Sequence, residues 1–181
     1  MRIIAGHWRG RKIEAPPGRS TRPTSDRARE GLFSMLQSRI GSFEGLEVAD
    51  LFAGTGALGL EALSRGAAYC TFVEKDRQAL DILRRSIATV GAGERADVRA
   101  QAVEHFVPPG RPFDLIFIDA PYGTGLAQAG LDRAAAWVAP GGWISLEVSG
   151  EAPSIPPLLE RDTERRYGKA VLHLLRRRSA L

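Results

Sequence analysis

The chain has 181 residues, a net charge of +4 and a single cysteine, Cys70. This length fits one domain with a hydrophobic core of its own. A lone cysteine excludes an internal disulfide, so we expect a buried apolar Cys70 and a reducing compartment. No apolar stretch approaches membrane-span length and no signal-peptide core opens the chain, which predicts a cytoplasmic protein.

Positive charge gathers at the start of the chain, where the first thirty residues hold eight basic and three acidic side chains. Residues 1–5 and 7–14 predict two short strands, and hence a β-hairpin arm that 15–23 links to the rest. A basic arm beside a nearly neutral body predicts a polyanionic partner, although a solvated surface segment is the alternative. Trp8 in this arm could stack on a nucleotide or simply cover the arm. The expected RNA-binding residues are Arg9, Arg11, Lys12, Arg22, Arg27 and Arg29.

Beyond the arm, helices and strands alternate. A helix is predicted from a cap among residues 24–26 to about Ile40, because apolar residues recur there at helical spacing. The predicted strands that follow are 46–51, 69–74, 97–100, 113–119 and 143–148, and the helices are 56–65, 77–90, 102–107 and 126–138. A turn is expected at 140–142, and 161–177 predicts two strands about Tyr167-Gly168. This alternation indicates an α/β fold with a mostly parallel sheet and one antiparallel strand.

A glycine-rich turn follows the strand at 46–51. Its residues 54–59, GTGALG, match the G-x-G-x-x-G dinucleotide fingerprint, and Glu74 ends the next strand where a ribose-binding acid would lie. The match alone leaves a nicotinamide dinucleotide and S-adenosylmethionine open. Asp50 favours S-adenosylmethionine, because a carboxylate would repel a pyrophosphate but could orient a cationic methionine group. Alternatively, Asp50 only caps the next helix and Glu74 is a solvated acid.

The tetrad Asp119-Ala120-Pro121-Tyr122 ends the apolar strand at 113–119, at the edge where open α/β sheets bind ligands. An acceptor beside an aromatic ring suits a planar base held by its exocyclic amine. In this interpretation the carboxylate and the alanine carbonyl accept the amine hydrogens, the proline shapes the turn and Tyr122 stacks on a flipped base. The alternative is that Tyr122 packs as a loop aromatic.

Several motifs occur in a characteristic order along nearly the whole chain: TRPTSDRARE at 21–30, DLFAGTG at 50–56, EALSRGA at 61–67 and FVEKD at 72–76. In this order they resemble the RsmD family of bacterial methyltransferases, which act on N2 of a guanine in 16S ribosomal RNA with S-adenosylmethionine. The resemblance implies a Rossmann-like, seven-stranded S-adenosylmethionine-dependent methyltransferase fold with an N-terminal β-hairpin that meets RNA. We accordingly expect a basic RNA-binding arm and linker at 1–20 and a methyltransferase domain at 21–181.

Two positions depart from the family pattern. The family usually has Asp-Pro-Pro-Tyr, and Ala120 keeps the needed carbonyl but lacks the fixed φ of proline, so we expect a less rigid loop. The family also tends to place Asp-Ala after its third strand, where this chain has Gln101-Ala102 as the expected adenine contact. The expected cofactor-binding residues are Asp50, Phe52, Gly54, Gly56, Glu74, Lys75, Gln101 and Ala102.

The resulting hypothesis is an enzyme that methylates a guanine N2 amine in 16S ribosomal RNA, as a monomer acting on an assembling small subunit. No histidine has a carboxylate or cysteine partner at ligand spacing, so no metal is expected. Two alternatives remain. An adenine-N6 DNA methyltransferase would use the same tetrad, although this chain is short for an enzyme that must also read DNA. A non-catalytic RNA-binding assembly factor would not need an intact Asp50 and Asp119.

Overall fold

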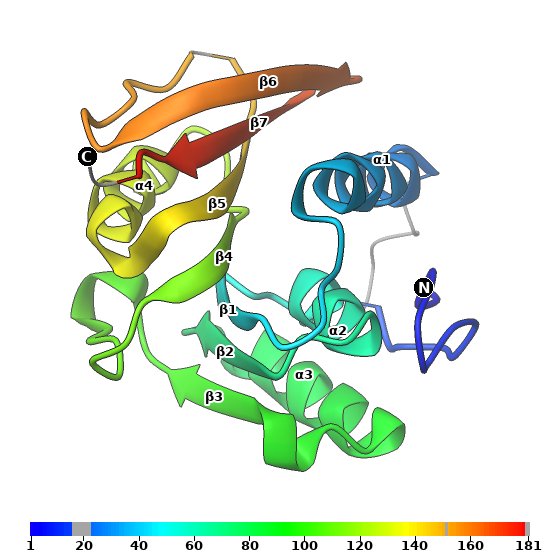
Figure 1. Ribbon diagram of the computed structural model, residues 1–181. Coiled ribbons are helices and arrows are strands. Elements are labelled where there is room, and N and C mark those ends of the chain that lie inside the picture. The colour runs from blue at the N-terminus through cyan, green and yellow to red at the C-terminus, as the bar shows by residue number, and fades with distance from the viewer. Residues whose placement is uncertain (16–22, 151, 180–181) are drawn as a thin grey trace.

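The computed structural model describes residues 1–15, 23–150 and 152–179. Seven strands form one sheet in the order β3-β2-β1-β4-β5-β7-β6 (Figure 1). The strands are β1 Glu47–Leu51, β2 Tyr69–Glu74, β3 Ala96–Ala100, β4 Phe113–Ile118, β5 Val138–Val148, β6 Leu159–Tyr167 and β7 Ala170–Arg177. The first five run parallel, and β7 is antiparallel to both β5 and β6. The predicted Rossmann-like sheet with one antiparallel strand is confirmed.

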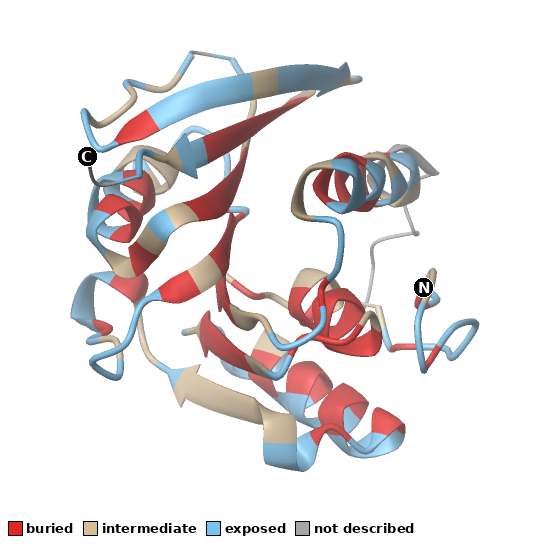
Figure 2. Ribbon diagram, in the orientation of Figure 1, coloured by how far each residue is buried: buried red, intermediate tan, exposed pale blue. Residues whose placement is uncertain are grey.

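Helices cover both faces of this sheet. They are α1 Pro23–Ile40, α2 Ala57–Ser64, α3 Arg77–Val90 and α4 Leu126–Trp137, with 3-10 turns at Gly93–Arg95 and Val103–His105. The helices α1, α2 and α3 pack on one face, where Phe72 and Phe117 are buried. The helix α4 packs on the other face against Ile116 and Ile118. Figure 2 shows the buried residues along the central strands and the helix sides that face them, whereas β6 is exposed along most of its length.

Two elements differ from the sequence prediction. The helix expected at 102–107 is only the 3-10 turn Val103–His105. The turn expected at 140–142 lies inside β5, where the strand is irregular. The pairing with β4 shifts there, since Phe113 pairs with Val138 whereas Leu115 pairs with Trp143. A Cβ on Gly142 would lie 3.0 Å from the Asp114 carbonyl oxygen, so glycine lets the irregular strand stay close to β4.

The N-terminal arm, residues 1–15, is closed by a single antiparallel bridge between Arg2 and Lys12 instead of two regular strands. Ile3 and Ile13 of the arm are buried in the same core as α1 and α2. The hairpin pairing is therefore short, and the arm gains its fixed position from packing against the domain.

Buried Glu61 of α2 anchors this arm. Its carboxylate accepts hydrogen bonds from the backbone N–H groups of Ile4 at 2.8 Å and Ala5 at 3.1 Å. It also lies 3.7 Å from the guanidinium of Arg29 in α1, which donates to the Arg2 carbonyl at 2.7 Å. The expected division at residue 20 stays a prediction, since that boundary lies outside the described residues.

Candidate active site

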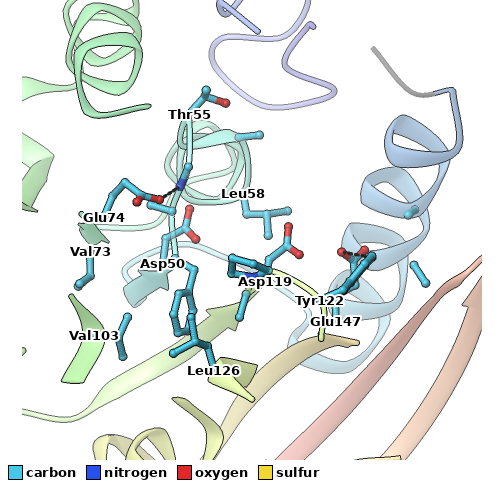
Figure 3. A pocket seen from close by; sticks show the side chains of 18 of the residues that line it. Asp50, Thr55, Leu58, Val73, Glu74, Val103, Asp119, Tyr122, Leu126 and Glu147 are labelled. Carbon is cyan, nitrogen blue, oxygen red and sulfur yellow. Dashed lines mark hydrogen bonds between the residues drawn. The ribbon is translucent and has the colours of Figure 1, made fainter. Parts of the chain in front are cut away.

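The carboxyl ends of the parallel strands surround a pocket of about 980 Å³ (Figure 3). Open α/β sheets bind ligands at this edge, and this volume lies at the upper end of the roughly 300–1,000 Å³ typical of small-molecule sites. The expected site residues that line the pocket are Asp50, Phe52, Gly54, Glu74, Lys75, Gln101, Ala102, Asp119, Ala120, Pro121 and Tyr122. The two predicted clusters, one for a cofactor and one for a base, thus share one cavity.

The glycine turn after β1 brings backbone to the pocket wall. Phe52 has φ of 59° and Gly54 has φ of 57°, and this left-handed conformation is uncommon for a bulky side chain. A Cβ on Gly54 would meet nothing within 4 Å, so its backbone borders open space. By contrast, a Cβ on Gly56 would lie 2.3 Å from Leu83 of α3. Gly56 therefore serves the packing of the turn and does not line the pocket.

Asp50 is buried beneath this turn, and its Oδ2 accepts the backbone N–H of Gly59 at 2.9 Å. Burial raises the pKa of Asp50 to about 8, the Gly59 hydrogen bond lowers it in part, and nearby Glu74 raises it further. Asp50 therefore caps the first turn of α2, as one of the two interpretations expected. Asp50 also lines the pocket, where a cationic ligand would favour its ionised form.

Glu74 is held firmly at the end of β2. Its two carboxylate oxygens accept backbone N–H groups from Gly54 at 2.8 Å, Lys75 at 2.8 Å and Asp76 at 2.9 Å. These bonds tie the glycine turn to the neighbouring strand, so Glu74 is not a freely solvated acid. A carboxylate has about four acceptor positions, which leaves room for a ligand hydroxyl.

Apolar side chains also line this half of the pocket. Val73, Val103 and Leu126 lie around it, as Figure 3 shows. The backbone N–H of Gln101 donates to the Glu74 carbonyl at 3.0 Å, which continues the pairing of β2 and β3 into the pocket wall. A flat ring would find apolar contacts here and polar groups at the rim. The adenine contact by Gln101 stays a prediction.

Asp119 follows β4 directly and lies beside Glu147 of β5. Its carboxyl group is open to solvent across the pocket, while protein surrounds it on the other sides. This partial burial, then a hydrogen bond and the charge of Glu147, raise the pKa of Asp119 well above its usual range. Glu147 was not among the site residues expected from the sequence. The available signal was its place at the end of the strand after the tetrad, since adjacent parallel strands end at one edge.

Side-chain hydrogen bonds hold Tyr122 and its loop in place. The Tyr122 hydroxyl donates to Glu147 Oε2 at 3.0 Å (Figure 3). The Thr124 hydroxyl donates to the Pro121 carbonyl at 2.7 Å and accepts the Leu126 N–H at 3.3 Å. The side chain of Thr124 thus bridges the turn that Ala120 was expected to leave less rigid. Tyr122 is 46% exposed, which leaves ring surface available for stacking.

The basic residues expected to bind RNA fall into distinct groups. Arg9, Arg11 and Lys12 on the arm are exposed, as is Arg27 on α1. Arg29 is only 7% exposed and is turned towards Glu61, so it does not present its charge to solvent as an RNA contact requires. Arg22 lies outside the described residues.

The arm reaches the pocket at both of its ends. Met1 and Ala15 line the pocket, whereas Trp8 is buried away from it with the Arg95 guanidinium 5.1 Å from its ring centroid. Of the two roles considered for Trp8, the structure favours covering the arm. The exposed charges of the arm are therefore held in a fixed relation to the pocket mouth.

The described ranges 1–15, 23–150 and 152–179 hold no group of three or more His, Cys, Asp or Glu residues that could bind a metal ion. No helix within those ranges is long and apolar enough to cross a membrane. The predicted burial of Cys70 in β2 is confirmed.

Residues 1–176 match the protein family described as Conserved hypothetical protein 95. The chain is 36% identical to ribosomal RNA small subunit methyltransferase D of Escherichia coli K12, over 98% of this chain and 90% of that protein. It is 38% identical to the Haemophilus influenzae protein of the same name, over 87% of this chain and 83% of that one. A solved Escherichia coli structure, described as a candidate methyltransferase, has a TM-score of 0.87, 33% identity and 99% coverage of both chains.

Proposed function

Because the chain belongs to the ribosomal RNA small subunit methyltransferase D family, we propose that it methylates the N2 amine of one guanine in small-subunit ribosomal RNA. The observation that carries this proposal is a single pocket with Asp50 and Glu74 in one half and Asp119, Ala120 and Tyr122 in the other. The methyl donor and a flipped base could meet in this one pocket.

The cofactor is S-adenosylmethionine, and the charges in the pocket suit it. Asp50 is a buried carboxyl group whose pKa is raised by that burial, and a cationic amino or sulfonium group would stabilise its ionised form. Glu74 is positioned to accept ribose hydroxyls, whereas the pyrophosphate of a dinucleotide would meet two carboxyl groups. When bound, S-adenosylmethionine supplies a methyl carbon made electrophilic by its sulfonium.

The chain must then position a weak nucleophile. The N2 lone pair of guanine is delocalised into the ring, so the amine needs acceptors that align it. We assign these roles to the Asp119 carboxylate and the Ala120 carbonyl, which would accept the two amine hydrogens and stabilise positive charge as the nitrogen becomes tetrahedral. As the bond between N2 and the methyl carbon forms, the bond between that carbon and the donor sulfur breaks, and the neutral thioether is the leaving group. One amine proton leaves to solvent, which reaches Asp119 at the exposed side of the pocket.

Tyr122 is proposed to stack on the target base once that base has left its helix or loop. Pro121 would shape the turn that carries Tyr122. Arg9, Arg11 and Lys12, with Arg27 on α1, are proposed to contact RNA phosphates. Their exposure and the contact of the arm ends with the pocket rim support this role.

We further propose that the enzyme acts as a monomer on 16S ribosomal RNA within an assembling small subunit. The test is to incubate small subunits from cells lacking this protein with labelled S-adenosylmethionine and to map the modified base. Label on N2 of one guanine is expected, and Asp119→Ala should abolish it while Asp81→Ala, at an exposed position on α3, should not. Label on adenine N6 instead, or none with the wild-type protein, would contradict the proposal.

A further inference from the structure

Glu147 and Asp119 are neighbours at the carboxyl edge of the sheet. In the parallel register of β4 and β5, Ile118 pairs with Leu146, so the next residue on each strand faces the same edge. Both carboxyl groups line the pocket, and they lie close enough for Glu147 to raise the pKa of Asp119. The base-binding half of the pocket therefore has two adjacent carboxyl groups. Asp119 has a proposed role as part of the tetrad, and Glu147 has none so far.

Tyr122 orients the side chain of Glu147. Tyr122 donates its hydroxyl to Oε2 at 3.0 Å, which orients the carboxyl group within the pocket (Figure 3). Among the residues that the structure describes, no lysine, arginine or histidine forms an ion pair with Glu147. A half-buried carboxylate without a cation is stabilised by a hydrogen-bond donor from a ligand.

The Watson–Crick edge of guanine carries two neighbouring donors, N1–H and the N2 amine, whereas adenine carries an amine beside an N1 lone pair. We infer that Glu147 determines base specificity by accepting the N1–H of the target guanine while Asp119 accepts an N2 hydrogen. This assignment rests on the proposed function and adds the group that chooses guanine. An adenine in the same position would place its N1 lone pair against a carboxylate, and a site built to receive a donor rejects a base that lacks it.

The analogue 2-aminopurine tests this assignment directly. It keeps the 2-amino group that would be methylated, but its N1 carries a lone pair in place of the hydrogen. Two synthetic RNAs with guanine or 2-aminopurine at the mapped position are compared under single-turnover conditions with saturating S-adenosylmethionine. Wild-type protein should methylate guanine faster by about 5- to 150-fold, the discrimination of one good set of base contacts.

Glu147→Gln supplies an amide that can donate to the N1 lone pair of 2-aminopurine and still accept the Tyr122 hydroxyl. Its guanine rate should fall and its 2-aminopurine rate should rise, so the ratio of the two rates should drop at least about tenfold. Tyr122→Phe removes the hydroxyl that donates to Glu147 and keeps the ring, and should change both rates in the same direction. Glu30→Gln removes an exposed carboxylate on α1 and should leave the ratio and the rates unchanged.

The outcomes separate this inference from the proposed function. If wild-type protein fails to methylate the guanine RNA, the proposed function and the inference both fall. If it methylates the two RNAs equally, or if Glu147→Gln leaves their ratio unchanged, Glu147 only orients Tyr122 and the inference alone is overturned. Calorimetry with S-adenosylmethionine checks that each variant is folded, and equal wild-type rates on the two RNAs would overturn the inference even if Glu147→Gln does not fold.

Discussion

Replacing Asp50 with asparagine should stabilise the free protein and weaken cofactor binding. The pKa of Asp50 is raised from 3.8 to about 8, chiefly by burial. Between those values the folded protein keeps a proton that the unfolded chain has released, so the free energy of unfolding falls as pH rises. The slope approaches about 1.4 kcal/mol per pH unit, or roughly 3 kcal/mol from about pH 5 to about pH 7. Asparagine keeps an acceptor for the Gly59 N–H but does not titrate, so this contribution should disappear.

Urea denaturation of both proteins without cofactor, at several pH values in that range, measures this slope. The relevant quantity is the difference between wild type and Asp50→Asn, because the contributions of groups that do not interact with Asp50 cancel. The raised pKa of Asp119 also makes the free energy of unfolding fall as pH rises. The pKa of His173, which burial lowers, makes the free energy of unfolding rise with pH. Parallel stability curves for the two proteins would refute the reasoning. Calorimetry should show S-adenosylmethionine binding weaker in the variant by about 1–3 kcal/mol, the scale of a charge-assisted hydrogen bond.

Three further results are expected. Asp119→Ala should lower the single-turnover rate on the order of 100-fold, with cofactor affinity within a few-fold; a near wild-type rate would exclude Asp119 as the amine acceptor. Glu147→Gln should move the pH at which the methylation rate rises to a lower value. The reason is that Asp119 must lose its proton to accept an amine hydrogen, and Glu147 helps to raise the pKa of Asp119. An unshifted profile would show that the two groups act independently. Alanine at Arg9, Arg11 and Lys12 should reduce the log-affinity against log-salt slope for RNA by up to about 0.7–0.9 per residue. An unchanged slope would mean that the arm is a solvated surface.

Substitution of the arm charges is a cleaner test of RNA binding than deletion of the arm. Ile3, Trp8 and Ile13 are buried in the main core. Removing them would expose apolar surface of the domain, and a loss of RNA affinity could then follow from instability. The exposed Arg9 and Lys12 can be changed without disturbing that packing.

Much of the site could be predicted from the sequence because its residues follow strands at fixed points. The tetrad after β4 and the glycine turn after β1 mark strand ends, and parallel strands end at one edge. Glu147 was missed because its strand carries no motif, and only the adjacency of β4 and β5 brings it to Asp119. Arg29 was assigned to RNA because its sequence neighbourhood is basic, but its direction is set by the buried charge of Glu61, which lies 32 positions away in the chain.

The anchoring of the arm by Glu61 makes the first fifteen residues unsuitable for grafting. Ser64 adds to the anchor, since its hydroxyl donates to the Ala5 carbonyl at 2.6 Å and accepts the Trp8 N–H at 3.0 Å. An arm transplanted onto a related enzyme would need matching partners on α2, and without them the backbone N–H groups of Ile4 and Ala5 would lose their acceptor, at a cost of about 1–3 kcal/mol for each group left unsatisfied. The arm that is proposed to contact RNA and the domain that anchors it must therefore diversify together, and the arm cannot be exchanged as a separate module.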